Sequence, residues 1–366
     1  MKKVPYNIYT DQFCFDREIE RIFKKSWLLV CTWPEIADPD SYVLVKTAAG
    51  EVIVTSNSGE AKAFYNKCLH RGHKLTKQER GNCSDNFTCP YHGWIYDSAG
   101  KLVKIPGGEK FYGSSLSSFE KKESIQPLAV ERIGDFIFVN AENEPIGIYE
   151  QFDQSVIDGL ELTKDKMGNT SLHLAVELPF NWKLIFENLR DGLHPLFLHQ
   201  NSLTKEVDFF FATDYVTTAT RPITKITQMS SFSRDGKLRD ANSDHKKHFQ
   251  LIDSGEYYLN WLLFPYSHIA SPDGGALIGI ENYVPLSANK TRFELRLHIT
   301  KRIGQASEIP ILHRWLSKAK KVFEEDLDAV VSIHANANNS DMKQHIGEYE
   351  LFNADIHKWF EDYIYG

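Results

Sequence analysis

The spacing of apolar side chains changes along the chain. Between residues 40 and 142, apolar and polar positions alternate in short runs such as YVLVKTA, EVIVTSN and AKAFYNK, separated by AAG and NSG. Alternation with a period of two predicts strands that bury one face, and glycine between the runs predicts tight turns. The later run LAVERIGDFIFVN has the form of a hairpin. This stretch is therefore expected to be a small antiparallel β domain.

Beyond residue 150 the pattern is mixed. Strand-like runs (LHLAVELPF, YYLNWLLF, ALIGIENYVPL and RFELRLHIT) are interspersed with two helical runs, WKLIFENL and LHRWLSKAKKVFEEDLDAVVSIHA. Such a mixture predicts an α+β domain. The expected division is an N-terminal segment 1–39, a β domain 40–142 and a larger domain 143–366. Two polar stretches, 104–124 and 233–249, are expected to be a long surface loop and a surface loop or short helix.

Composition limits the class of protein. The 366 residues are 42% hydrophobic, which is enough for about two domains with their own cores. The net charge is −7 and no long basic run occurs, so nucleic acid and anionic membrane surfaces are not expected partners. No stretch reaches the ~18 apolar residues of a membrane span. The five scattered cysteines suit a reducing compartment, and we expect a cytoplasmic protein.

Residues 68–94, CLHRGHKLTKQERGNCSDNFTCPYHGW, contain Cys68 with His70 and then Cys89 with His92. Either a tetrahedral zinc ion or an iron–sulfur cluster uses ligands of these types. Zinc fingers usually pair cysteine with cysteine and histidine with histidine, whereas each segment here offers one of each. A Rieske [2Fe–2S] cluster has two thiolates on one iron and two imidazoles on the other. The mixed pairs therefore favour the cluster over zinc.

A second histidine motif lies in NWKLIFENLRDGLHPLFLH, which contains Asp191, His194 and His199. Two imidazoles and one carboxylate form the facial triad of non-haem Fe(II) oxygenases. In a straight helix, His194 and His199 would lie about 140° apart around the axis, too far to share a metal. The helix is therefore expected to break. Pro195 supplies the cause, because it lacks the N–H that would bond the carbonyl of Asp191.

The carboxylate of such a triad has a second candidate on the late helical run. Its apolar stripe is formed by Phe323, Leu327, Val330 and His334. Asp326 lies about 60° from Phe323 at the edge of this stripe, whereas three other acids point about 100° or more away. Those acids are Glu324, Glu325 and Asp328. A carboxylate so close to the buried stripe needs a partner.

The segments CLHRGHKL and CPYHGWIYDSAGKL closely resemble the Rieske domain of the large (alpha) subunit of Rieske non-haem iron oxygenases. The resemblance implies an antiparallel β Rieske domain inserted in a helix-grip catalytic domain, a curved antiparallel sheet with helices. It further implies that Cys68 and Cys89 bind one cluster iron and His70 and His92 the other. The mononuclear Fe(II) would be held by His194, His199 and Asp326. Asp191 would not be a ligand, because in the family this aspartate bridges to a cluster histidine of the neighbouring subunit.

The function implied by the resemblance is that of a terminal oxygenase. A separate NAD(P)H-dependent reductase, with or without a ferredoxin, would supply electrons, and a homotrimer would use O₂ to hydroxylate a small organic substrate. The catalytic motif is closest to aromatic ring-hydroxylating oxygenases, with Asn188 three residues before Asp191 as in those acting on aromatic acids. Three alternatives remain: an oxygenase or demethylase acting on a quaternary or methylated amine, a pure Rieske electron carrier, and a zinc-binding module.

Overall fold

A computed structural model describes residues 2–83, 86–113, 123–209, 229–337, 342–347 and 350–365. The chain forms two compact units, one of Lys24–Ile146 and one of Met1–Phe23 together with Gly147–Gly366. These limits differ from the predicted boundary at residue 40. The reason is that β2 (Leu28–Thr32) pairs with β11 (Phe136–Asn140), which ties residues 24–39 to the smaller unit. Across the described residues, no helix combines the length and apolar character that a membrane crossing requires.

The smaller unit consists of short antiparallel sheets. A four-stranded sheet has the order β5-β4-β3-β6, and two three-stranded sheets have the orders β10-β11-β2 and β7-β8-β9. The remaining bounds are β3 Ser41–Thr47, β4 Gly50–Asn57, β5 Glu60–Tyr65, β6 Arg80–Asn82, β7 Asn86–Thr88, β8 Ile95–Asp97, β9 Leu102–Lys104 and β10 Ala129–Ile133, with α2 Trp33–Ile36 and α3 Gly108–Tyr112. The alternating runs of the sequence are these strands. The predicted loop 104–124 contains α3, and its residues 114–122 lie outside the described part.

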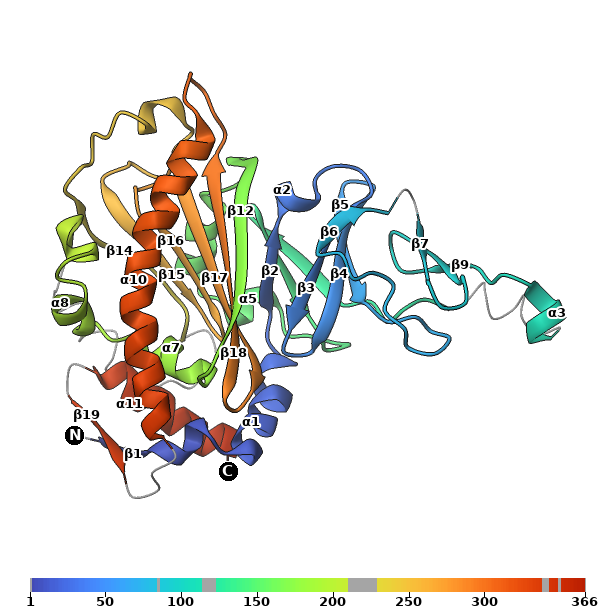
Figure 1. The fold of residues 1–366 in the computed structure, drawn as a ribbon, viewed down its shortest axis with the longest axis horizontal. Coiled ribbons are helices and arrows are strands. Elements are labelled where there is room, and N and C mark those ends of the chain that lie inside the picture. Colours follow the sequence, from blue (N-terminus) through green and yellow to red (C-terminus); the bar gives the residue numbers. More distant parts are fainter. Residues whose placement is uncertain are drawn as a thin grey trace. The chain divides into compact units, whose positions relative to one another are not determined.

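The larger unit is built on a seven-stranded antiparallel sheet of order β12-β18-β17-β16-β15-β14-β13 (Figure 1). Its strands are β12 Met167–Leu178, β13 Val207–Phe209, β14 Ser231–Leu238, β15 Tyr257–Leu263, β16 Ser267–Ser271, β17 Leu277–Ser287 and β18 Lys290–Thr300. A separate two-stranded sheet pairs β1 (Lys2–Pro5) with β19 (Lys343–Ile346). The expected α+β class and helix-grip arrangement are confirmed.

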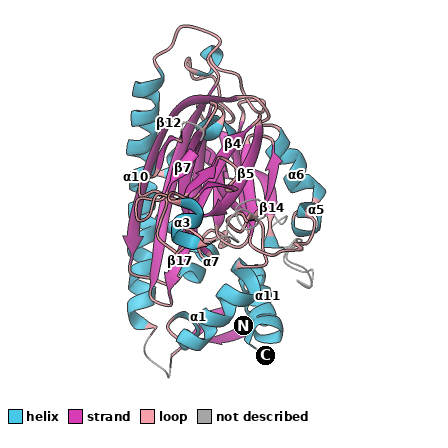
Figure 2. Ribbon diagram, turned by 90° about the vertical axis from the view of Figure 1, so that its right-hand side faces the viewer, coloured by secondary structure: helices cyan, strands magenta, loops and turns pink. Residues whose placement is uncertain are grey.

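Helices cover both faces of the seven-stranded sheet. The long α10 (Glu308–Asn336) runs along one face, and α6 (Gln154–Glu161) packs on the other (Figures 1 and 2). A β-carbon on Gly159 of α6 would come within 2.6 Å of Trp261 Nε1, so that helix needs glycine there. The other helices are α1 Gln12–Glu18, α5 Ile148–Gln151, α7 Trp182–Asn188, α8 His194–Leu198 and α11 Leu351–Trp359, with shorter turns 6–9, 19–23, 203–205, 246–248 and 360–365.

The polar stretch 233–249 is only partly the loop or short helix that its composition predicted, since residues 239–248 are turns with a short helix at 246–248. Its first residues belong to β14, which pairs with both β13 and β15. The register of β14 shifts between Arg234 and Gly236, so Asp235 is the extra residue of a β-bulge. Gly236 fits because a β-carbon there would lie 2.6 Å from the backbone oxygen of Asp208. Cross-strand pairing therefore overrides the polar composition.

Helix α7, which leads to the histidine motif, is fixed by a buried ion pair. Glu18 is fully buried and accepts hydrogen bonds from Lys183 Nζ at 2.6 Å and Trp182 Nε1 at 2.7 Å. The hydroxyl of Tyr365 donates to the same carboxylate at 2.6 Å. These hydrogen bonds of Glu18 thus join α1 and the C-terminal turn to the first residues of α7.

We expect Glu18→Gln to lower the free energy of unfolding by about 3–5 kcal/mol, because it leaves the Lys183 ammonium buried without its counter-charge. Urea unfolding followed by circular dichroism measures the loss. The double variant Glu18→Gln with Lys183→Met removes both charges at similar volume and should recover most of it. An equal loss in both variants would show that packing, and not charge, holds α7 here.

Candidate functional site

Two loops of the smaller unit present Cys68, His70, Cys89 and His92. Their backbones follow one pattern, since Gly72 N donates to Cys68 O at 2.8 Å and Gly93 N donates to Cys89 O at 2.9 Å. Each glycine lies four residues after its cysteine and has a positive φ, +72° and +74°. A residue with a β-carbon is strained in that conformation. The pattern therefore builds two equivalent turns, each with one thiol and one imidazole.

The four side chains divide by burial. Both cysteines are only 2% exposed, whereas His70 is half-buried and His92 is exposed. The Nδ1 atoms of the two imidazoles lie 3.1 Å apart, and the ring of His70 stacks on Trp94 with centroids 5.0 Å apart. Burial raises the pKa of the Cys68 thiol, although a contact of 3.1 Å with the buried Tyr96 hydroxyl opposes this. The thiols thus lie inside and the imidazoles at the surface.

This arrangement fits a [2Fe–2S] cluster better than a single zinc ion. Around tetrahedral zinc the ligand atoms lie about 3–4 Å apart, because each is only about 2.0–2.3 Å from the metal. Within the described residues, three ligand atoms come within 4.8 Å of one another only at a different place, His194, His199 and Asp326. In a [2Fe–2S] cluster the thiols bind a buried iron and the imidazoles bind an outer iron, so the four ligand atoms can lie farther apart than around one zinc ion.

The histidine motif follows a break between α7 and α8, as Pro195 predicted. Helix α7 ends at Asn188, and α8 begins at His194 with the proline in its first turn. The carbonyl of Asp191 lacks a proline N–H to bond and instead meets His194 Nδ1 at 2.7 Å. The carboxylate of Asp191 accepts from Leu193 N at 2.8 Å. The break therefore sets both the position and the tautomer of His194.

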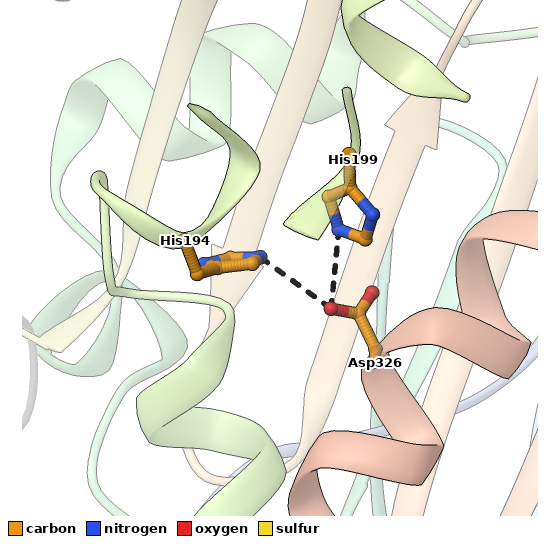
Figure 3. Close-up of side chains that lie close together, drawn as sticks. All are labelled: His194, His199 and Asp326. Carbon is orange, nitrogen blue, oxygen red and sulfur yellow. Dashed lines mark ion pairs between the residues drawn. The ribbon is translucent and has the colours of Figure 1, made fainter. Parts of the chain in front are cut away.

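The side chains of His194, His199 and Asp326 converge (Figure 3). Asp326 Oδ1 on α10 lies 3.1 Å from His199 Nε2 and 3.5 Å from His194 Nε2. Asn188 Nδ2 donates to the same oxygen at 2.9 Å. The structure thus brings the second carboxylate candidate, Asp326, to the two imidazoles, while the side chain of Asp191 bonds its own turn.

Glu325 is a residue that the sequence reasoning missed. Its position, about 100° or more from Phe323, gave no reason to expect a role at the site. Its Oε2 lies 2.8 Å from His199 Nδ1 and also accepts a hydrogen bond from Ser202 Oγ. This long side chain on α10 thus reaches the segment that carries His199 and Ser202. An acid adjacent to a candidate ligand was the available signal.

These hydrogen bonds make the three converging groups suitable for a metal. Both imidazoles use Nδ1 toward an oxygen acceptor, which leaves each Nε2 lone pair facing the Asp326 carboxylate. A lone pair so close to a carboxylate is stabilised by a positive charge between them, either a proton on the imidazole or a metal ion bound to both groups. Burial lowers the pKa of His194 and also opposes protonation of His199, but the nearby carboxylates Asp326 and Glu325 raise the pKa of His199 overall. Two imidazoles and one carboxylate suit Fe(II).

The three groups open into a cavity of about 850 Å³ between α8, α10 and the sheet. Apolar and aromatic side chains form most of its described wall; the aromatic ones are Phe209, Tyr258, Tyr283, Trp315 and Phe323. Four other aromatic residues of this unit do not line the cavity. Phe180, Phe186 and Trp261 are buried core residues, and Phe197 is 75% exposed. A cavity of this size accommodates a small organic molecule.

Comparisons with known proteins match both parts of the chain. Residues 26–120 match the family model of the Rieske [2Fe–2S] domain, and residues 165–366 match that of the ring-hydroxylating alpha subunit, catalytic domain. The carnitine monooxygenase oxygenase subunit of Acinetobacter pittii is 31% identical over 52% of this chain and 50% of its own length. The anthranilate 1,2-dioxygenase large subunit of Acinetobacter baylyi is 33% identical over 54% and 43%. The aligned part spans about half the length of these relatives.

The fold is similar to that of solved structures over nearly the whole chain. A quaternary ammonium Rieske monooxygenase, described as revealing carnitine oxidation by gut microbiota and inter-subunit electron transfer, superposes with a TM-score of 0.74. The match covers 98% of this chain and 95% of that protein at 21% identity. At that identity the likeness establishes the fold.

Proposed function

The chain belongs to the family of ring-hydroxylating alpha subunits, and from this premise we propose that it is a terminal oxygenase component. One observation carries the proposal: the same chain has the four-residue cluster motif and a second, convergent set of iron ligands that opens into a cavity. When bound, the cluster supplies single electrons and the Fe(II) activates O₂ for insertion into a substrate. An electron carrier or a zinc-binding module needs only the smaller unit.

In this proposal Cys68 and Cys89 hold one cluster iron, and His70 and His92 hold the other. His194, His199 and Asp326 hold the Fe(II), while Asn188 and Glu325 keep the ligands in position through hydrogen bonds. The apolar wall excludes water around the bound substrate. Asp191 is assigned to electron transfer, because its carboxylate is outside the converging set and remains available to a cluster histidine of a neighbouring subunit.

The proposal includes partners and location. We infer a homotrimer that receives electrons from an NAD(P)H-dependent reductase, directly or through a ferredoxin. Inter-subunit electron transfer, named for the structural relative, supports a multimer in which one chain's cluster serves its neighbour's iron. The cytoplasm is the proposed location, since a reducing compartment keeps the five free cysteines as thiols.

An aromatic compound is the first substrate candidate, supported by the apolar and aromatic wall and by the relative that acts on anthranilate. A methylated or quaternary amine is the second. It is favoured by two carboxylates of the wall, the half-buried Asp235 and the buried Glu281, and by the relative that acts on carnitine. In both cases the product is a substrate into which oxygen has been inserted.

The test counts O₂ uptake against product with NADH and a reductase, over aromatic acids, aromatic amines and methylated amines. We expect uptake to depend on one substrate class and to match product one to one, and His194→Ala to abolish product while the cluster spectrum persists. Uptake that yields only peroxide with every compound, or purified protein that contains zinc and no iron, would contradict the proposal.

A further inference from the structure

A chain of buried and half-buried polar side chains runs along the cavity wall and is separate from the residues proposed to hold either metal. It consists of Asp235, Asn260, His268, Glu281 and Tyr283, all of which line the cavity. Asn260 Nδ2 donates to Asp235 Oδ2 at 2.6 Å, and Asn260 Oδ1 lies 3.0 Å from His268 Nε2. His268 Nδ1 lies 3.0 Å from Glu281 Oε2, which also accepts from the Tyr283 hydroxyl at 2.7 Å. We call this set the wall network.

Strand register places the wall network on the cavity face of the sheet. Its members come from four adjacent strands, β14 to β17, and His268 pairs directly with Glu281 across β16 and β17. Ser233 pairs with Asn260, and Asp235, two residues later, lies on the same face of β14. Asp235 is also the extra residue of the β14 bulge, and bulges are common beside active sites.

The wall network carries net negative charge. With the Asn260 amide donating to Asp235, both ring nitrogens of His268 face acceptors, Asn260 Oδ1 and Glu281 Oε2. Two carboxylates therefore share at most one imidazolium. Burial raises the pKa of Asp235, whereas the nearby charges of His268 and Arg190 lower it. The network thus brings two carboxyl groups and one imidazole to the cavity, and its carboxylate charge faces that cavity.

No described side chain inside the cavity neutralises that charge. The three lysines of the lining, Lys205, Lys318 and Lys321, are all exposed. Arg190 is outside the lining, where its guanidinium donates to Ser231 Oγ and to the carbonyl of Met229, and its charge acts on Asp235. Glu281 has no such cation beside it among the described lining residues, and a bound cation would stabilise its carboxylate.

We propose that the wall network anchors the protonated nitrogen of an amine substrate, and that a hydrogen on this nitrogen is donated to Glu281. The oxygen Glu281 Oε1 is suited to this, because no hydrogen bond to it comes from a described residue, whereas Oε2 already accepts two. Tyr283 and Glu281 line the same cavity as His194, His199 and Asp326. An amine anchored at Glu281 would therefore lie in the cavity into which the iron ligands open.

The chemistry favours an ammonium with at least one N–H over a quaternary ammonium. Carboxylate oxygens gain from accepting a charge-assisted hydrogen bond, and a trimethylammonium group has no hydrogen to donate. A trimethylammonium group beside Glu281 would exclude water from the carboxylate and could not replace the hydrogen bonds that water donates to it. A benzoate-type carboxylate would meet like charge at the same place. Binding of the amine does not depend on the proposed oxygenase function; only the oxidation of the bound amine rests on it.

The first test measures binding to the oxygen-free, reduced holoenzyme by calorimetry, with four probes that share one ring: benzylamine, benzyltrimethylammonium, benzyl alcohol and benzoate. We expect benzylamine to bind about ten- to a hundredfold more tightly than the other three, the difference that one charge-assisted hydrogen bond makes. Equal affinity for benzyltrimethylammonium would overturn the N–H anchor. Tighter binding of benzoate or benzyl alcohol would overturn the anchor for cations altogether.

The second test uses isosteric variants with both metals verified. Glu281→Gln and Asp235→Asn should each abolish the preference for benzylamine, and Glu177→Gln, which removes an exposed carboxylate of β12 that pairs with Lys290, should not. Unchanged selectivity in Glu281→Gln would overturn the proposal. Binding is measured without O₂, so the amine anchor and the oxygenase function can be contradicted separately. Amine binding that depends on Glu281, without any oxidised product when O₂ is supplied, contradicts only the oxygenase function. Oxidation of benzoates with no amine preference contradicts only the anchor.

Discussion

Asp326→Ala is expected to remove the mononuclear iron and abolish product formation while the cluster keeps its colour. Asp326 Oδ1 is the atom on which both imidazoles converge, and its loss leaves two neutral ligands with no negative charge to hold a cation. Loss of a direct ligand should exceed the about 10- to 100-fold effect typical of an outer hydrogen-bond partner. Iron analysis together with visible and EPR spectra measures both metals in one preparation.

The controls for this prediction are the residues around the carboxylate. Glu325→Gln keeps an oxygen opposite His199 Nδ1 but removes its charge, so iron affinity should fall by about 10- to 100-fold and not disappear. Asp328→Asn, on an exposed position of the same helix, should change neither metal. If Asp326→Ala retained its full iron and Asp191→Ala lost it, the third ligand would be Asp191, and the assignment from the convergence at Asp326 would be wrong.

Local signals in the sequence were sufficient to predict much of the site. The glycine four residues after each cysteine and Pro195 after His194 act on the backbone within a few residues, so their effect could be predicted without knowledge of the fold. Asp326 could be predicted because α10 is long and regular, so the angle from the apolar stripe is reliable. Its contact with two histidines more than a hundred residues earlier came from the resemblance, since no local pattern relates them.

The residues that were missed depend on pairing between distant segments. The role of Glu325 was missed because its partners, His199 and Ser202, lie about 120 residues away in the sequence. Asp235 lay in a run whose polar composition predicted a loop, and only pairing with β15 makes it a strand with a bulge. The Asp235-Gly236 pair was the available signal, because an isolated glycine in a strand is typical of a bulge. Composition alone could not place that bulge beside a cavity.

Asp191→Asn is expected to retain both metals and substrate affinity, yet slow reoxidation of the cluster, with substrate and O₂ present, by about 10- to 100-fold. The structure separates the roles of this residue. Its backbone carbonyl meets His194 Nδ1 and is unaffected by the substitution, and an asparagine oxygen can still accept from Leu193 N. Only the negative charge is removed. If that charge orients and couples imidazoles of two metal sites, the defect must appear in transfer and not in assembly.

Stopped-flow absorbance of the reduced cluster measures this rate, and two variants show what a slow rate means. Asp191→Glu retains the charge and should recover part of the rate, whereas Asp191→Ala also removes the acceptor for Leu193 N and should loosen the turn that carries His194. Iron loss in Asp191→Ala but not in Asp191→Asn would locate the structural role in the hydrogen bond to Leu193. Reoxidation of Asp191→Asn at the wild-type rate would leave the carboxylate with that local role alone, and electrons would have to reach the iron by a route that does not include residue 191.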